Sequence, residues 1–355
     1  MPDAPLDCHV MGAGAAGLTA AIYLARFRRR FQVIDGGASR AALIPMSHNH
    51  AGYPGGIHRA TLIERMTARA RMYGASIRPG TVSGLQRRPD GTFLAKVCED
   101  AIAARTVLLA TGVVDRGPEL PDVTGVIQRG RNRHCDICDG YEVIGHRVGI
   151  VGQGSSGLHQ ALFLRTYTSD ITLLSFLSFG TPKSLSREER RTAESAALVL
   201  VEGPVTSVTL GGDRIISLTL RSGVCHVFDT VYSALRSDAR SSLVRPLGTT
   251  LDDNGCVVTD EHQRSSTASL FAAGDVVRSP DQISVAMGEA AIAATVIHNL
   301  LRGAPSPASP IDTALSSSPG RLDTERIDTL VDTHAARRLA RSSASSSSAV
   351  AGRVA

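Results

Sequence analysis

The sequence contains no tryptophan, and aromatic residues make up only 4% of its 355 residues. Proteins that hold single-stranded nucleic acids usually stack the bases on aromatic rings, so this scarcity argues against such partners despite a net charge of +5. The one dense basic run, residues 26–30, follows an expected helix, where cations favourably oppose the helix dipole. We therefore expect no nucleic-acid partner.

Long apolar runs and a secretory signal are also missing. No stretch approaches the ~18 consecutive apolar residues that a membrane-spanning helix needs. The first residues, MPDAPLDCHVMGAG, lack the basic and apolar regions of a signal peptide. We expect a cytoplasmic protein without a membrane partner. The length allows two domains with substantial cores, and 43% hydrophobic with 20% charged residues is typical of a globular chain.

Cysteines are few and scattered, which excludes a disulfide framework. Of the six, only Cys135 and Cys138 lie close together. A structural zinc site takes four nitrogen or sulfur ligands. The adjacent His134 is badly placed to share an ion with them, and the sequence has neither a second C-x-x-C nor a spaced histidine pair. We therefore expect no metal.

The two readings that remain are an inert pair and a redox dithiol. A C-x-x-C pair in a βαβ chain is usually redox-active. One thiolate attacks a disulfide and its neighbour resolves the mixed disulfide. Asp139, which follows Cys138 directly, is a candidate acid or base for moving a proton on or off a thiol.

A glycine-rich turn near the start predicts a dinucleotide site. Gly12, Gly14 and Gly17 form a G-x-G-x-x-G that follows an expected strand and opens an expected helix. The first glycine makes the tight turn, the second lets a pyrophosphate approach the backbone, and the third allows close helix–strand packing. Asp35 ends the next strand, where a carboxylate can bind ribose hydroxyls.

The same pattern recurs as a candidate second nucleotide site at Gly152, Gly154 and Gly157. The strand that follows, ITLLSFLSFG, ends without an acid for a ribose and without an arginine cluster for a 2′-phosphate, the nearest arginine being Arg187. The fold of a nicotinamide domain is therefore expected without its recognition residues. This argues against NADPH or NADH as the electron donor.

The composition changes beyond Gly303. Residues 304–355 are rich in serine, alanine and proline, and such a segment cannot bury enough apolar surface to fold alone. We expect a mostly disordered tail.

Two Rossmann-type units, a C-x-x-C-D-G between them and a late AAGD together resemble the thioredoxin reductase family of FAD-dependent disulfide oxidoreductases. The resemblance runs from about Cys8 to Leu301. It implies an α/β fold with two Rossmann-like, three-layer nucleotide-binding domains, the smaller inserted into a discontinuous FAD domain. Residues 1–117 and 245–303 would form the FAD domain, and 118–244 the pyridine-nucleotide-like insert that carries the dithiol.

The resemblance also implies roles for single residues. Cys138 would face the flavin and Cys135 would attack the substrate, and the dipole of the last helix would favour negative charge on the reduced ring. Histidines His48, His50 and His134 are candidates for lining the flavin face or moving protons. The residues implied to hold FAD are Gly12, Gly14, Ala15, Ala16, Gly17, Asp35, Gly36, Arg40, Asn49, Val82, Thr111, Gly112, Gly274, Asp275, Gln282 and Ile283.

The chain departs from the family where NADPH is recognised. Ser175, Phe176 and Leu177 stand where NADPH-dependent members begin an HRR-x-x-x-R stretch. SHNHAGYPGG and CDGYEV look more like a branch without that motif, which resembles enzymes fed by ferredoxin or flavodoxin and dithiol oxidases that reduce oxygen. We expect a homodimeric dithiol/disulfide oxidoreductase acting on a thioredoxin-like protein or a small-molecule dithiol. The alternative from another class is a flavin redox sensor without turnover.

Overall fold

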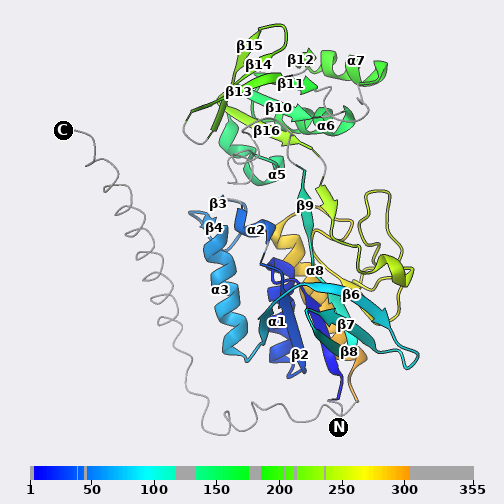
Figure 1. Ribbon diagram of the computed structural model, residues 1–355. Coiled ribbons are helices and arrows are strands. Elements are labelled where there is room, and N and C mark those ends of the chain that lie inside the picture. Colours follow the sequence, from blue (N-terminus) through cyan, green and yellow to red (C-terminus); the bar gives the residue numbers. More distant parts are fainter. Residues whose placement is uncertain are drawn as a thin grey trace, which may run out of the picture.

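The computed structural model describes residues 4–37, 39–43, 46–116, 133–152, 154–175, 185–202, 205–211, 214–235 and 237–303. These residues form a lower and an upper α/β unit, and the chain passes from the lower to the upper unit and back (Figure 1). Strands β9 (Val113–Asp115) and β17 (Ser237–Ala239) pair antiparallel at the crossing. The predicted tail, 304–355, and the expected start of the insert, 118–132, lie outside the described residues.

The lower unit is built on one mixed sheet in the order β5-β2-β1-β8-β7-β6, with β18 also paired to β8. Strands β5, β2, β1, β8 and β18 run parallel, and β7 and β6 extend the sheet antiparallel. Buried apolar side chains on both faces favour a central parallel strand. The bounds are β1 Leu6–Met11, β2 Phe31–Asp35, β5 Ile77–Pro79, β6 Val82–Arg87, β7 Phe93–Val97, β8 Asp100–Leu109 and β18 Leu270–Ala272.

Three helices cover one face of this sheet: α1 (Ala15–Arg26), α3 (Arg59–Met72) and α8 (Ile283–Leu300). Alanines fill the contact between α1 and α8 and let the two helices approach closely; the buried ones are Ala20, Ala21, Ala290, Ala293 and Ala294. On the other face, buried side chains of β1, β8 and β18 cluster with those of β6, β7 and the segment 243–257. Helix α2 (Arg40–Leu43) and the short strands β3 (Met46–Ser47) and β4 (Ile57–His58) lie near the start of α3 (Figure 1).

Helix α8 is long and apolar enough to cross a membrane by length and composition alone. Core helices of globular proteins pass the same test. Here α8 packs along α1 and over the sheet, with Ala286, Ala290 and Ile297 buried. The buried face of α8 therefore belongs to the core of the lower unit.

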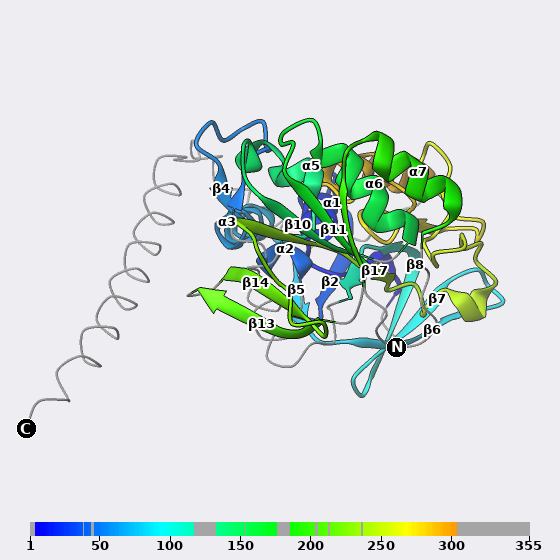
Figure 2. The same ribbon diagram turned by 90° about the horizontal axis from the view of Figure 1, so that it is seen from above.

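The upper unit has a second parallel sheet in the order β12-β11-β10-β16. Helices α6 (Gly154–Leu164) and α7 (Arg187–Ser195) lie on one side, and an antiparallel sheet, β13-β14-β15, lies on the other (Figure 2). The bounds of the strands are β10 Val148–Gly152, β11 Ile171–Ser175, β12 Val199–Glu202, β13 Val205–Gly211, β14 Arg214–Leu220, β15 Cys225–Val227 and β16 Thr230–Ala234.

The predicted α/β class with two Rossmann-like, three-layer units is confirmed. A hairpin around Gly91 joins β6 to β7, whose register runs from Val82–Val97 to Arg87–Phe93. Strands β13 and β14 also pair antiparallel, and the turn between them lies outside the described residues. The short helix α5 (Asp136–Asp139) and the 3₁₀ turn Tyr141–Val143 lie on the side of the upper unit that faces the lower unit (Figure 1).

Candidate active site at a dithiol-lined cavity

The first glycine turn is shaped by two positions where no side chain fits. Gly12 has φ +110°, and a Cβ atom there would overlap the carbonyl oxygen of Ala110. A Cβ atom on Gly17 would overlap the carbonyl oxygen of Gly12. Gly14 differs, because the nearest atom to its Cβ would be Ser39 Oγ, at an ordinary 3.6 Å. The fold itself therefore requires Gly12 and Gly17, and leaves the space beside Gly14 open.

A cavity of about 670 Å³ extends from this turn to the cysteine pair. Such a volume is typical of a small-molecule or cofactor site. Gly17 and Asn49 lie outside its wall, Gly17 because it packs behind Gly12. The predicted residues on the wall are Gly12, Gly14, Ala15, Ala16, Asp35, Gly36, Arg40, Val82, Thr111, Gly112, Gly274, Asp275, Gln282 and Ile283, together with Cys135 and Cys138.

The lining has the features that a dinucleotide needs. The first turn of α1 offers backbone N–H groups and the positive end of a helix dipole, which suit a pyrophosphate. Asp35, at the end of β2, supplies the carboxylate for a ribose. Gly274 has φ +80°, and a Cβ atom added to it would lie 3.0 Å from the Cβ atom of Ala16. The late AAGD stretch therefore packs against the start of α1. The described residues therefore fit FAD.

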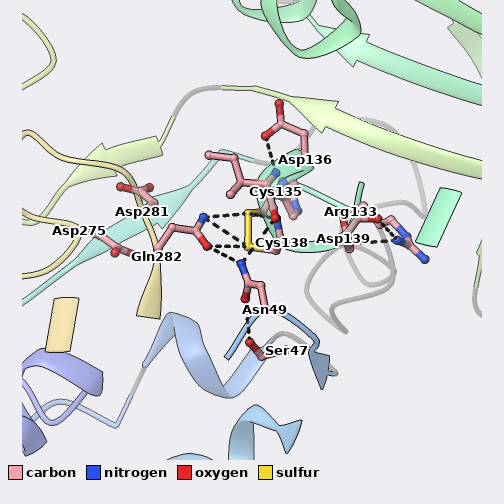
Figure 3. The surroundings of a disulfide bond; sticks show 12 residues. Ser47, Asn49, Arg133, Cys135, Asp136, Cys138, Asp139, Asp275, Asp281 and Gln282 are labelled. Carbon is pink, nitrogen blue, oxygen red and sulfur yellow. Dashed lines mark hydrogen bonds and ion pairs between the residues drawn. A yellow bond between two sulfur atoms is a disulfide. The ribbon is translucent and has the colours of Figure 1, made fainter. Parts of the chain in front are cut away.

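Cys135 and Cys138 form a disulfide at the upper end of the cavity (Figure 3). Cys135 is the N-cap of α5, and its Sγ accepts from the Cys138 N–H at 3.1 Å. Gln282, which directly precedes α8, donates from Nε2 to Cys135 Sγ at 3.3 Å and to Cys138 Sγ at 3.5 Å. Its Oε1 accepts from Asn49 Nδ2 at 2.8 Å. The dithiol of the upper unit is thus held against residues of the lower unit.

Asp139 points into the upper unit. The Tyr232 hydroxyl donates to its Oδ1 at 2.7 Å, and Arg133 Nη1 lies 3.2 Å from its Oδ2. Burial raises the pKa of the Asp139 carboxyl, while Arg133 and the Tyr232 hydroxyl hold that pKa down. Within the described part of the chain, the Asp139 carboxylate accepts a hydrogen bond from Tyr232, forms an ion pair with Arg133 and hydrogen-bonds to neither sulfur.

The backbone around the dithiol is anchored to the upper sheet. Arg133 pairs with Tyr232 as an isolated parallel bridge, with Ser233 N–H donating to Arg133 O at 2.8 Å. Gln160, on α6, donates from Nε2 to the His134 carbonyl at 3.0 Å. These contacts fix α5 relative to β16 and α6, and sequence reasoning missed all three partners because each lies far from the cysteines in sequence.

The Arg40 guanidinium forms ion pairs with three carboxylates. It contacts Asp115 at 2.7 Å, Asp275 at 2.9 Å and Asp281 at 2.8 Å. Burial raises the pKa of Asp281 to about 6, and the neighbouring Asp275 adds to this. Because Asp115 belongs to the crossing strand β9, Arg40 ties the crossing to the lower unit.

Arg59 was not predicted from sequence and lines the same cavity. It is only 5% exposed, and its Nε has no hydrogen-bond partner. A lone arginine after an unremarkable histidine carries no recognisable signal in the sequence, so only the fold reveals its position.

The second glycine turn has the same packing but a different neighbourhood. Gly152 and Gly157 lie so close that a Cβ atom on either would crowd the other. A second cavity, of about 450 Å³, lies beside α6 and is lined by His134, Asp136 and Gln160 among others. Its charged wall consists of Asp115, Asp136, Asp281 and Arg40. Such a wall favours cations over phosphates.

The candidate histidines do not line the large cavity. His48 Nδ1 lies 3.8 Å from Glu142 Oε1, across the two units, and His50 stacks edge-on against Tyr53. His134 lies on the second cavity, where burial lowers its pKa.

Comparison with known proteins assigns the family. The profile of the family described as pyridine nucleotide-disulphide oxidoreductase matches residues 6–290. The chain belongs to this family. The first glycine turn, the cysteine pair and the late glycine–aspartate pair all fall within the matched residues.

Relatives of this pyridine nucleotide-disulphide oxidoreductase include thioredoxin reductases. That of Peptoclostridium acidaminophilum is 28% identical over 312 residues, covering 81% of this chain and 95% of the relative. That of Mycolicibacterium smegmatis is 30% identical over 280 residues, covering 76% and 88%.

Two crystal structures share the fold. HlmI is 27% identical with a TM-score of 0.76, covering 95% of this chain and 98% of its own. The thioredoxin reductase of Streptococcus pyogenes MGAS5005 has the same TM-score of 0.76 at 24% identity, covering 84% and 98%, which supports the fold alone.

The chain is thus a flavoprotein disulfide oxidoreductase of the thioredoxin reductase type. FAD, when bound, supplies two-electron redox chemistry. The first glycine turn, Asp35 and the cysteine pair line the same cavity.

Proposed function

We propose that the protein passes electrons between FAD and the Cys135–Cys138 pair, and between that pair and an external thiol or disulfide. One observation carries this proposal: both cysteines line the cavity that begins at the Gly12–Gly17 turn. A cysteine pair that shares a wall with the cofactor site can exchange electrons with the cofactor, whereas an inert pair needs no such placement.

Within this proposal the wall residues of the cavity hold FAD. Gly12, Gly14 and the first turn of α1 bind the pyrophosphate, Asp35 the adenosine ribose, and Gly274 with Asp275 the ribityl side. Gln282 and Ile283, at the start of α8, approach the ring. Cys138 faces the flavin, Cys135 attacks the substrate, and Asp139 moves the proton.

Single-cysteine variants test the division of labour between the sulfurs. In Cys135→Ser, the Cys138 thiolate has no disulfide partner and should donate charge to oxidised flavin, so a long-wavelength absorbance band should appear while turnover is lost. Cys138→Ser should also lose turnover but lack the band, and should trap substrate as a mixed disulfide at Cys135. Near-native turnover in both variants would remove the dithiol from the reaction and leave the flavin-bound sensor.

A thioredoxin-like protein is the partner that we propose first, because the named relatives are thioredoxin reductases. Ile137 and Tyr141, beside the disulfide, are 50% and 75% exposed, so a macromolecule can reach this edge. Reduction of thioredoxin by the flavin-loaded protein, with reduced ferredoxin, NADPH or NADH as donor, tests partner and donor together.

The second candidate is oxidation of a small-molecule dithiol with oxygen as acceptor. The acidic wall of the second cavity favours it, because a reaction that takes its electrons from a dithiol needs no pyridine nucleotide. Hydrogen peroxide formation with dithiothreitol as the only reductant would identify it. The proposal also includes a cytoplasmic location, which is expected from the sequence, and a homodimer, which the resemblance implies.

A further inference from the structure

Arg59 is a buried cation for which the described residues supply no ion pair. It is the first residue of α3, is 5% exposed and lines the 670 Å³ cavity. Its Nε lacks a hydrogen-bond partner, and no ion pair joins its side chain to any residue in the described ranges. Burial of a charge without a counter-ion is unfavourable. Burial lowers the pKa of Arg59 to about 10, and Arg40 adds to this, so the side chain is still charged at neutral pH.

Arg59 lies at the sulfur end of the cavity. The charges that act on it are those of Arg40, Asp139, Asp275 and Asp115, which surround the dithiol and the crossing strand. The first turn of α3 is also on the side of the lower unit that faces α5 (Figure 1). Arg59 is therefore placed for the ring of a bound flavin rather than for its phosphates.

The neighbouring cation cannot take this role. Arg40 also lines the cavity, but contacts with Asp115, Asp275 and Asp281 already use its guanidinium. Arg59 has the charge, the burial and the unused donor that an anionic group inside the cavity requires. In a site shielded from water, such a donor interacts strongly with developing charge.

We propose that Arg59 holds the negative charge that the flavin ring gains on reduction, and so favours electron flow from the dithiol to the flavin. This rests on the proposed function. Oxidation of the Cys135–Cys138 dithiol to the disulfide releases two electrons and two protons. The ring takes both electrons and one proton, its remaining negative charge is matched by the Arg59 guanidinium, and the second proton leaves to solvent.

The test compares FAD-loaded protein with Arg59→Met, which removes the charge at similar length, and Arg59→Lys, which keeps it. Arg71→Met is the control, because Arg71 is an exposed cation on the same helix. Equilibration with a reference dye gives the reduction potential of the bound flavin. We expect Arg59→Met to disfavour the reduced flavin at least tenfold, which is about 30 mV for a two-electron couple. Arg59→Lys should recover most of the difference, and Arg71→Met should match wild type.

The wild-type protein provides a test that needs no variant. If Arg59 stabilises an anionic reduced ring, the potential should change by about 30 mV per pH unit near neutrality, the slope for one proton per two electrons. A slope of about 60 mV, the value for two protons per two electrons, would overturn the proposal. These measurements report on the flavin alone, so they hold even if the external partner is wrong and turnover fails.

Two further readouts separate this role from a structural or phosphate-binding one. The cofactor-free Arg59→Met protein should melt at the same or a higher temperature than wild type, since an unpaired buried charge is removed, and FAD should raise its melting temperature less. Binding of adenosine diphosphate should be unchanged, because it reaches only the phosphate end. A marked loss of stability in the cofactor-free variant, or lost adenosine diphosphate binding, would contradict the assignment.

Discussion

His9 makes the stability of the lower unit depend on pH. It lies in the central strand β1, is fully buried, and neither ring nitrogen has a hydrogen-bond partner among the described residues. Burial lowers its pKa from 6.5 to about 4. The unfolded chain therefore binds a proton more readily than the folded one between these pH values, and stability falls as the pH drops through this window.

Replacement of His9 by leucine should remove this dependence. The difference between 6.5 and about 4 corresponds to roughly 3.5 kcal/mol, at about 1.4 kcal/mol per pKa unit. Urea unfolding of wild type and His9→Leu from pH 7.5 to 4 should show a smaller loss of unfolding free energy in the variant. His262→Gln, at an exposed histidine, is the control. Parallel curves for wild type and His9→Leu would mean that His9 is not responsible.

The Tyr232 hydroxyl should set the pH at which Asp139 titrates. It donates to Asp139 Oδ1 at 2.7 Å and helps to hold down a pKa that burial raises. In Tyr232→Phe the carboxylate loses this bond, so the inflection that Asp139 contributes to the pH–rate profile should move to higher pH.

Steady-state rates of disulfide exchange across pH check this, with Tyr73→Phe as a remote control. Asp139→Asn should abolish the inflection and slow turnover roughly 10²–10⁴-fold if Asp139 is the general acid. An unmoved inflection in Tyr232→Phe would show that the hydroxyl is only structural. A normal profile in Asp139→Asn would remove Asp139 from proton transfer.

At the residue scale, sequence reasoning found the groups whose spacing is local. The C-x-x-C pair and the glycines of the first turn are recognisable because neighbours in the chain act together. Arg59, Tyr232 and Gln160 could not be found this way. Their importance comes from partners more than 20 residues away in sequence, or from burial beside a cavity that forms only when two units fold.

At the scale of elements, the turn between β1 and α1 separates a folding role from a binding role. Gly14→Leu should fold with near-normal stability, because the space beside Gly14 is open. Its side chain would fill the path of the pyrophosphate, so the purified protein should be colourless. Gly17→Ala should instead destabilise the fold by roughly 1–3 kcal/mol, because its Cβ would overlap the Gly12 carbonyl.

Melting temperature and the ratio of flavin to protein distinguish the two variants. The expected result is a stable, flavin-free Gly14→Leu and a destabilised Gly17→Ala. A yellow Gly14→Leu protein with full flavin content would show that the cofactor approaches elsewhere. The glycine pattern alone could not assign these separate roles, since it gives both positions the same residue.

The second glycine turn shows where the same pattern stops being informative. Gly152 and Gly157 reproduce the close helix–strand packing of Gly12 and Gly17. That packing is needed by any β–α unit of this geometry, whether or not a nucleotide binds. The absence of an acid and of an arginine cluster after Ile171, visible in the sequence, was therefore more informative about function than the glycines themselves.

At the scale of the whole molecule, the candidate site exists only where the two units meet. The disulfide is carried by α5 of the upper unit. Gln282, which donates to the disulfide, and Asn49, which donates to Gln282, belong to the lower unit. Arg40 joins the crossing strand to the segment before α8 through Asp115 and Asp281. Such long-range contacts lie beyond local sequence patterns, although the resemblance anticipated which residues would meet.

The arrangement of charge across the molecule predicts that NADPH is a poor reductant, with no marked preference over NADH. The cavity beside the second glycine turn carries Asp115, Asp136 and Asp281, and its one arginine, Arg40, is already paired. Each charge-assisted hydrogen bond missing from a 2′-phosphate site costs on the order of 1.5–3 kcal/mol.

Anaerobic titration of the flavin-loaded protein, followed by flavin bleaching, measures this directly. Dithiothreitol should bleach the flavin through the cysteine pair, which shows that the protein is competent, while NADPH and NADH should both reduce it slowly and without saturation. Cys135→Ser is the matched control, because it should lose bleaching by dithiothreitol and leave the slow reaction with NADPH unchanged. Fast, saturable reduction by micromolar NADPH would contradict the prediction and would require cations from residues beyond the described cavity wall to complete a phosphate site.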